Sequence, residues 1–116
     1  MLVHKMKWLF IALRDFVQQA HLSLNCFNDV HHVVPTEHKT LLVVSTGLDL
    51  VVEIDMTGKI VREWFTIESS DWSRFSRSTN YRKVLSIKPH HSHPNFVLQH
   101  DGQVWAARFE QKMRCV

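Results

Sequence analysis

The fold is decided by the stretch LLVVSTGLDLVVEIDMTGKIVREWF, residues 41–65. It holds three short runs rich in valine, isoleucine and leucine, at residues 41–45, 50–55 and 60–65. Runs of this length and composition, bounded by turn residues, are typical of β-strands. Thr46-Gly47 and the segment 56–59 supply the turns between them. The stretch therefore predicts tightly connected antiparallel strands.

The strand pattern extends to both sides of this stretch. Residues 30–34 form a further run before a polar break at 35–39, which makes four strands in succession. The pattern restarts with strands at 93–98 and 104–108, and a third begins near Met113. Placing His31 over His93 gives a repeat offset of 62 residues.

A meander that repeats along the chain is typical of a β-propeller or a similar array. The sequence predicts an all-β fold, a partial β-propeller with one complete four-stranded antiparallel blade and part of a second. A propeller closes with at least about four blades. We therefore expect either a fragment or a chain whose ring is completed by the remaining blades on partner chains.

Four segments follow from this pattern. They are an N-terminal segment (1–28), a complete blade (29–66), a long basic connector (67–92) and an incomplete second blade (93–116). The connector carries Trp72, Arg74, Arg77, Arg82, Lys83 and Lys88. Connectors of this length in compact folds are usually functional or disordered.

The N-terminal segment fits two structures. Apolar residues at 9, 12, 13, 16, 17 and 20 follow the spacing of an amphipathic helix over residues 8–21. Two strands near 8–13 and 20–27 fit as well. The apolar run 8–13 is too short for a signal-peptide core of about 7–15 residues or a membrane span of about 20. We expect no membrane association and a cytoplasmic protein, with its location otherwise open.

Charge and cysteine content narrow the class of protein. The net charge of +3, without a dense basic stripe, does not indicate nucleic-acid binding. Nine histidines would raise the charge to +12 when protonated below about pH 6, so solubility and binding should depend on pH. Cys26 and Cys115 match no disulfide or zinc pattern and are expected to be free thiols.

Three stretches of the sequence resemble blades of six-bladed propellers. They are FNDVHHV (27–33), STGLDLVVEID (45–55) and KPHHSHPNFV (88–97). The chain resembles the NHL-repeat and gluconolactonase-like group over residues 27–116, a group that extends towards arylsulfotransferase-like propellers. Lactonase relatives hold a central metal with acidic and asparagine side chains, and Asn95 matches such a ligand. The group also includes non-enzymatic binding modules, so the resemblance implies the fold rather than an activity.

Strand direction brings the unusual residues of such a fold to one rim. If each first strand runs from the upper to the lower rim, the upper rim receives the strand starts, the turns between second and third strands, and the connector. These segments carry Asp29, His31, Lys88, His91, His93, Asn95 and Arg108. Strand alternation gives His91, His93 and Asn95 one orientation, with His31 equivalent to His93. His32 has the opposite orientation and should pack between blades.

Two kinds of chemistry fit these residues. Imidazoles with a carboxylate or an amide bind divalent metals, so Asp29, His31, His91, His93 and Asn95 are candidate ligands. Without a metal, the three histidines are candidate general acids and bases. Lys88 and Arg108 would then hold an anionic substrate.

Three functions remain open from the sequence. The first is a hydrolase-like enzyme, metal-dependent or not, that acts on a small polar or anionic substrate. The second is a non-catalytic propeller module that binds a ligand or a protein on its rim. The third is a truncated product without independent activity. Histidines at strand starts also cap backbone groups, which is the structural alternative for each candidate.

Overall fold

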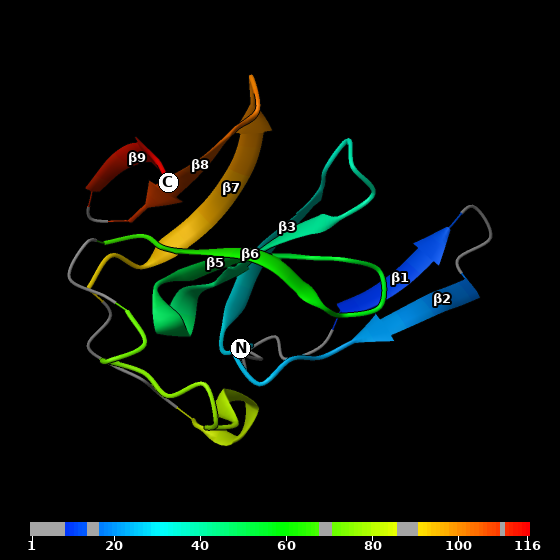
Figure 1. Ribbon diagram of the computed structural model, residues 1–116, viewed down its shortest axis with the longest axis horizontal. Helices are drawn as coiled ribbons and strands as arrows, with labels where there is room; N and C mark the ends of the chain where they lie inside the picture. The colour runs from blue at the N-terminus through cyan, green and yellow to red at the C-terminus, as the bar shows by residue number, and fades with distance from the viewer. Residues whose placement is uncertain (1–8, 14–16, 68–70, 86–90, 110) are drawn as a thin grey trace, which may run out of the picture.

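The computed structural model describes residues 9–13, 17–67, 71–85, 91–109 and 111–116. Its strands and 3-10 turns are β1 (Leu9–Leu13), β2 (Val17–Leu22), β3 (Val30–Pro35), β4 (Leu41–Ser45), η1 (Thr46–Leu48), β5 (Leu50–Ile54), β6 (Ile60–Phe65), η2 (Tyr81–Lys83), β7 (Pro94–His100), β8 (Gln103–Arg108) and β9 (Gln111–Cys115). They form three antiparallel sheets, each in chain order: β1-β2, β3-β4-β5-β6 and β7-β8-β9 (Figure 1). We call the second sheet the first meander and the third sheet the second meander. Within the described ranges, no helix has the length and apolar character needed to cross a membrane.

The predicted four-stranded antiparallel sheet is confirmed. Each observed strand of the first meander lies within one residue of its predicted range. The β5–β6 turn shows the local chemistry: Asp55 Oδ1 accepts hydrogen bonds from Thr57 N (2.8 Å) and Lys59 N (3.0 Å). Gly58 in the same turn has a φ of +89°, which favours glycine. The predicted all-β class therefore holds.

The helix predicted over residues 8–21 is wrong. Residues 9–13 and 17–22 are the strands of an antiparallel hairpin, with a register shift between Ile11 and Ala12. Apolar residues occupy nearly every position from 8 to 13, so the run satisfies the helical and the strand template at once. The strand alternative was correct in kind, although its second strand spans 17–22 instead of 20–27.

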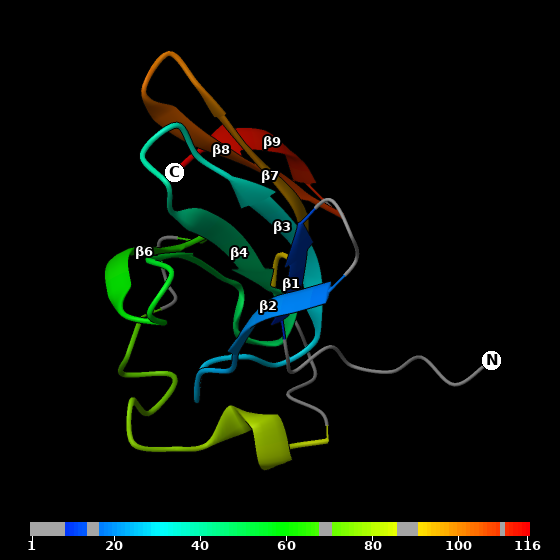
Figure 2. The same cartoon turned by 90° about the vertical axis from the view of Figure 1, so that its right-hand side faces the viewer.

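The first meander is buried on both of its faces. One face packs against the second meander through Leu42, Val44, Val51, Val97, Val104 and Ala106. The other face packs against the N-terminal segment and the connector through residues that include Val43, Val52, Phe27, Phe75 and Tyr81. Figure 2 shows the second meander lying along one side of the first, with β1 and β2 on the opposite side. Burial on both faces explains why β4 and β5 are continuous apolar runs rather than alternating ones.

The two meanders begin with the same backbone geometry. Asp29 and His93 directly precede β3 and β7 and have positive φ angles of 54° and 48°. Each strand then shows a register shift after its first residue. In both meanders the positive-φ residue accepts a main-chain hydrogen bond from just beyond the second strand: Thr46 N to Asp29 O is 3.3 Å and Phe109 N to His93 O is 3.2 Å. The repeat inferred from the sequence therefore exists in three dimensions.

The repeat offset of 62 residues needs correction. Matching the shared geometry places His93 over Asp29, an offset of 64 residues in the first strands. Matching Phe109 to Thr46 gives 63 in the second strands, because the hairpin loop of the second meander is one residue shorter. His31 consequently corresponds to Asn95 and not to His93. The bulge also breaks the strict alternation on which the predicted side-chain orientations depended.

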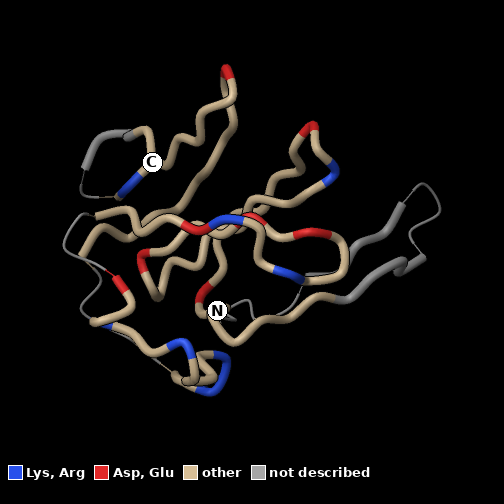
Figure 3. Tube along the Cα trace, in the orientation of Figure 1, with Lys and Arg blue, Asp and Glu red and all other residues tan. Residues whose placement is uncertain are grey.

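The connector packs against the first meander over its described part, residues 71–85. Asn28 Nδ2 donates to the carbonyl oxygens of Tyr81 and Val84, both at 2.8 Å. Three of its arginines bind groups of the chain itself: Arg74 binds Asp49, Arg77 binds Glu63, and Arg82 binds residues 23, 25 and 80. Figure 3 shows the cluster of cations in this segment, to one side of the sheets. These arginines therefore stabilise the connector.

Candidate functional site

Three of the predicted site residues come together: Asp29, His31 and His93. His31 Nε2 lies 3.3 Å from Asp29 Oδ1. The imidazole rings of His31 and His93 have centroids 5.2 Å apart and an interplanar angle of 76°. The two rings come from the starts of two different meanders. We call these three residues the histidine site.

Local backbone geometry places these side chains. Asp29 adopts a left-handed conformation, which aspartate tolerates better than most residues because its side chain bonds locally. The bulge that follows turns His31 out of the alternation of β3. The His93 ring contacts Phe109 at 5.7 Å between centroids, and Phe109 is 74% exposed. The His31 side chain is 31% exposed, so the histidine site is open to solvent.

Other predicted residues lie apart from this contact. Asn95 sits in the bulge of β7 and is exposed. Arg108 Nη1 donates to Thr66 O at 3.1 Å, while its Nε is buried and has no hydrogen-bond partner. His91 is exposed, and its backbone N–H is bound by Asp49 as described below. Lys88 lies outside the described residues.

The expected orientation of His32 agrees with the structure. Its Nδ1 accepts a hydrogen bond from Val97 N at 3.2 Å, which links β3 to β7. Its ring stacks on Phe96 with centroids 4.4 Å apart and planes 27° from parallel. His32 thus lies between the two meanders, as predicted.

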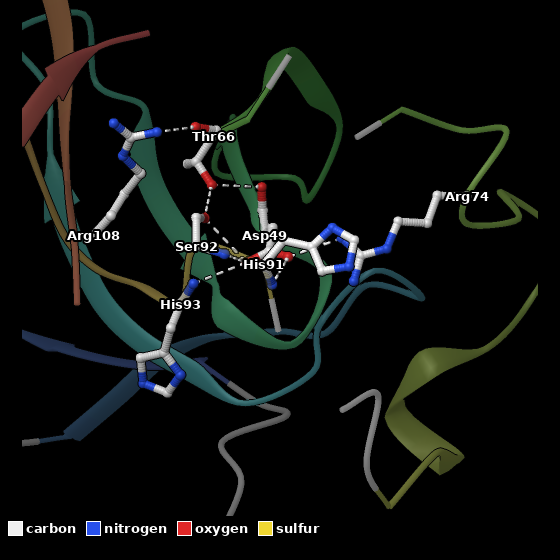
Figure 4. A network of polar contacts seen from close by, with 7 residues as sticks. All are labelled: Asp49, Thr66, Arg74, His91, Ser92, His93 and Arg108. Carbon is white, nitrogen blue, oxygen red and sulfur yellow. Dashed lines mark hydrogen bonds and ion pairs between the residues drawn. The ribbon is translucent and has the colours of Figure 1, made fainter. Parts of the chain in front are cut away.

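Sequence reasoning missed the most highly bonded carboxylate near the site, that of Asp49. Asp49 is fully buried and follows η1 with a φ of +53°. Its Oδ1 accepts from Ser92 N (3.1 Å) and His93 N (3.0 Å). Its Oδ2 accepts from His91 N (3.0 Å) and from Arg74 Nη1 (2.9 Å). Figure 4 shows this network, with the His93 ring pointing away from it.

Three consecutive N–H groups form an anion-binding concavity of the kind that often holds phosphate, filled here by a side chain of the same protein. Burial raises the pKa of the Asp49 carboxyl. The hydrogen bonds from His91, Arg74, Ser92 and His93 outweigh burial and hold the pKa below its usual value of 3.8. Asp49 is therefore an ionised, structural carboxylate. An acidic residue between the apolar runs 41–45 and 50–54 was the available signal, because a buried carboxylate needs several donors.

The described residues do not fit a metal ion. Among them, no group of three or more His, Cys, Asp or Glu side chains is arranged to hold one. Asp29 forms an ion pair with His31, and the His31–His93 contact is between ring faces and edges. The metal-ligand role expected for these residues therefore has no geometric support.

Both cysteines are free, as predicted. Burial raises the pKa of the Cys26 thiol to about 11, so this thiol is protonated and unreactive at neutral pH. Searches of protein-family models, of curated proteins and of solved structures found nothing that matches this chain. The argument for function therefore rests on the geometry of the chain.

Proposed function

We propose that this chain is part of a β-propeller protein whose histidine site performs hydrolase-like acid–base chemistry on a small polar or anionic substrate. The observation that carries the proposal is the 5.2 Å contact between His31 and His93, with the Asp29 carboxylate 3.3 Å from His31 Nε2. Two solvent-accessible imidazoles and one carboxylate from two successive meanders are the residue types that proton transfer requires.

The geometry assigns a role to each residue. The carboxylate of Asp29 accepts the Nε2–H of His31, which leaves the Nδ1 lone pair of His31 to take a proton from water or from a substrate hydroxyl. His93 lies on the other side of the shared space and is placed to return a proton to the leaving group. No metal is part of this proposal, because the donor arrangement does not fit one.

Equivalent faces of the two meanders support the propeller architecture. The face of the first meander that carries Leu42 receives the second meander. By the 63-residue offset of the second strands, Trp105 is the equivalent of Leu42. Trp105 and Leu98 pair across β7 and β8 and line an open hollow of about 470 Å³. We propose that this face receives a further four-stranded meander of the same kind.

Turnover of two chromogenic probes tests the site: p-nitrophenyl acetate and the anionic p-nitrophenyl phosphate. We expect the full chain to hydrolyse at least one of them, and His31→Gln and His93→Gln each to lose about 100-fold to 10,000-fold of that rate. His38→Gln is the matched control. His38 also contacts a carboxylate, that of Glu37 at 3.6 Å, but in the exposed β3–β4 turn.

The alternative, a non-catalytic binding module, gives a different result. The full chain would then hydrolyse neither probe, although inorganic phosphate would still shift the NMR signals of His31 and His93. Equal turnover by wild type and His31→Gln would overturn the assignment of the site.

A further inference from the structure

We propose that Asp49 is a positioning residue for the histidine site, because its buried carboxylate fixes the backbone that carries His93 against His31. The catalytic relevance of this inference rests on the function proposed above. Its geometric content does not, and the experiment below separates the two.

Residues 91–93 have few other constraints in the described structure. They precede β7 and belong to no strand. His93 has a φ of +48°, and a left-handed conformation costs a non-glycine residue about 1–2 kcal/mol. Such a conformation persists where the surroundings hold it in place. Hydrogen bonds from all three consecutive N–H groups to one carboxylate provide that hold.

Asp49 is itself fixed within the first meander. Its N–H donates to Thr46 O at 3.1 Å, and its carbonyl oxygen accepts from Thr66 N (2.9 Å) and Thr66 Oγ1 (3.0 Å). The side chain of Ser92 adds a bond to Asp49 Oδ1 at 3.1 Å. The start of the second meander is thereby held at a set distance from the start of β3, which carries His31. The contact between the two imidazoles follows from this arrangement.

Arg74 plays a different part in the same network. It pairs with Asp49 Oδ2 and balances the charge, but it does not contact the backbone bonds of Ser92 and His93 to Oδ1. Replacing Arg74 should lower stability while leaving the position of His93 largely unchanged. Replacing Asp49 should change both.

The test measures the nuclear Overhauser effect (NOE) between the ring protons of His31 and His93 in the full chain. In Asp49→Asn we expect this NOE to disappear while the amide signals of β3–β6 keep their positions. Asp55→Asn is the matched control, because Asp55 also accepts backbone N–H bonds, from Thr57 and Lys59, in an exposed turn of the same sheet. Asp55→Asn should retain the NOE. Its persistence in folded Asp49→Asn would overturn the proposal.

A second measurement needs no variant and applies even if Asp49→Asn does not fold. The amides of Ser92 and His93 lie outside any strand, so their hydrogen exchange at neutral pH reports the bonds to Asp49 directly. We expect these amides to exchange at least about tenfold more slowly than unprotected ones. Exchange at the unprotected rate would overturn the proposal. Slow exchange without turnover of either probe would support the positioning role of Asp49 and count against the proposed function alone.

Discussion

Gly47 faces the side chain of Asn28 at a distance that leaves no room for a methyl group. A Cβ atom at Gly47 would lie 2.1 Å from Asn28 Oδ1 and 2.8 Å from its Cγ. Asn28 is fully buried and anchors the connector through Tyr81 and Val84, so it has little freedom to move aside. The glycine is therefore required by close approach.

Gly47→Ala is expected to lower the free energy of unfolding by about 1–3 kcal/mol, the usual cost of an added group in a packed site. Urea unfolding of the full chain measures this change. If the clash with Asn28 is the cause, Asn28→Ala/Gly47→Ala should be no less stable than Asn28→Ala alone. Strictly additive losses would point to another cause.

The Asp49 carboxylate should make stability depend on acid pH. Because its pKa in the folded state is below 3.8, the contribution is fully present above that pH and is lost as the pH falls through the folded-state pKa. At neutral pH, Asp49→Asn should cost about 3–5 kcal/mol, since it leaves Arg74 without its buried partner. Unfolding of wild type and variant between pH 7 and pH 2.5 measures this difference, which should shrink only below pH 3.8. A difference that is constant with pH would contradict the prediction.

At this scale the sequence predicted part of the site. Asp29, His31 and His93 were found because polar residues at strand starts stand out against apolar runs. Asp49 was passed over because its donors are main-chain N–H groups 42 to 44 residues away, which no side-chain pattern records. His91 and Asn95 were placed with His93 by alternation, which the bulge and the positive φ interrupt.

Among the elements, strands bounded by turn residues were predictable and the N-terminal hairpin was not. The runs 41–45, 50–55 and 60–65 are β-branched and punctuated by Gly47 and Gly58. The run 8–13 offers neither punctuation nor alternation, so local periodicity favoured a helix that tertiary structure overrides. The packing of the connector through Phe75 and Tyr81 also depends on contacts distant in sequence.

His32 is the side chain that joins β3 to β7, and its removal should loosen the two meanders. His32→Ala loses the bond from Val97 N and the stacking on Phe96. The expected loss of unfolding free energy is about 1–3 kcal/mol, because the buried N–H is left unsatisfied. Thermal unfolding measures it, with His38→Ala in the exposed β3–β4 turn as control. Hydrogen exchange at Val97 should accelerate in His32→Ala and stay unchanged in the control.

For the molecule as a whole, the equivalent faces predict self-association. In a solution of this chain alone, the only further meanders available to cover Leu98 and Trp105 belong to other copies. We therefore expect the apparent mass in light scattering to rise with concentration. Leu98→Lys should suppress this rise, whereas Val61→Lys, at a 50% exposed position on β6, should not. A wild-type chain that stays monomeric at all concentrations would contradict the docking face.

The sequence predicted the architecture of the molecule through its repeat. The repeat is visible because both meanders use the same strand lengths and turns. Its register was off by one to two residues because loop length and bulges do not appear in a hydrophobic pattern. The closed ring of blades stays a prediction.

The long sequence separation of the Asp49 bonds has a consequence for synthesis. The backbone groups that bind this carboxylate lie 42 to 44 positions further along the chain. At a translation rate of about 5–20 residues per second, they emerge from the ribosome about 2–8 s after Asp49. Until then the nascent first meander would have to bury a charge that lacks most of its native partners. The turn at Asp49 should therefore close late, and the two meanders should reach their native form together during translation.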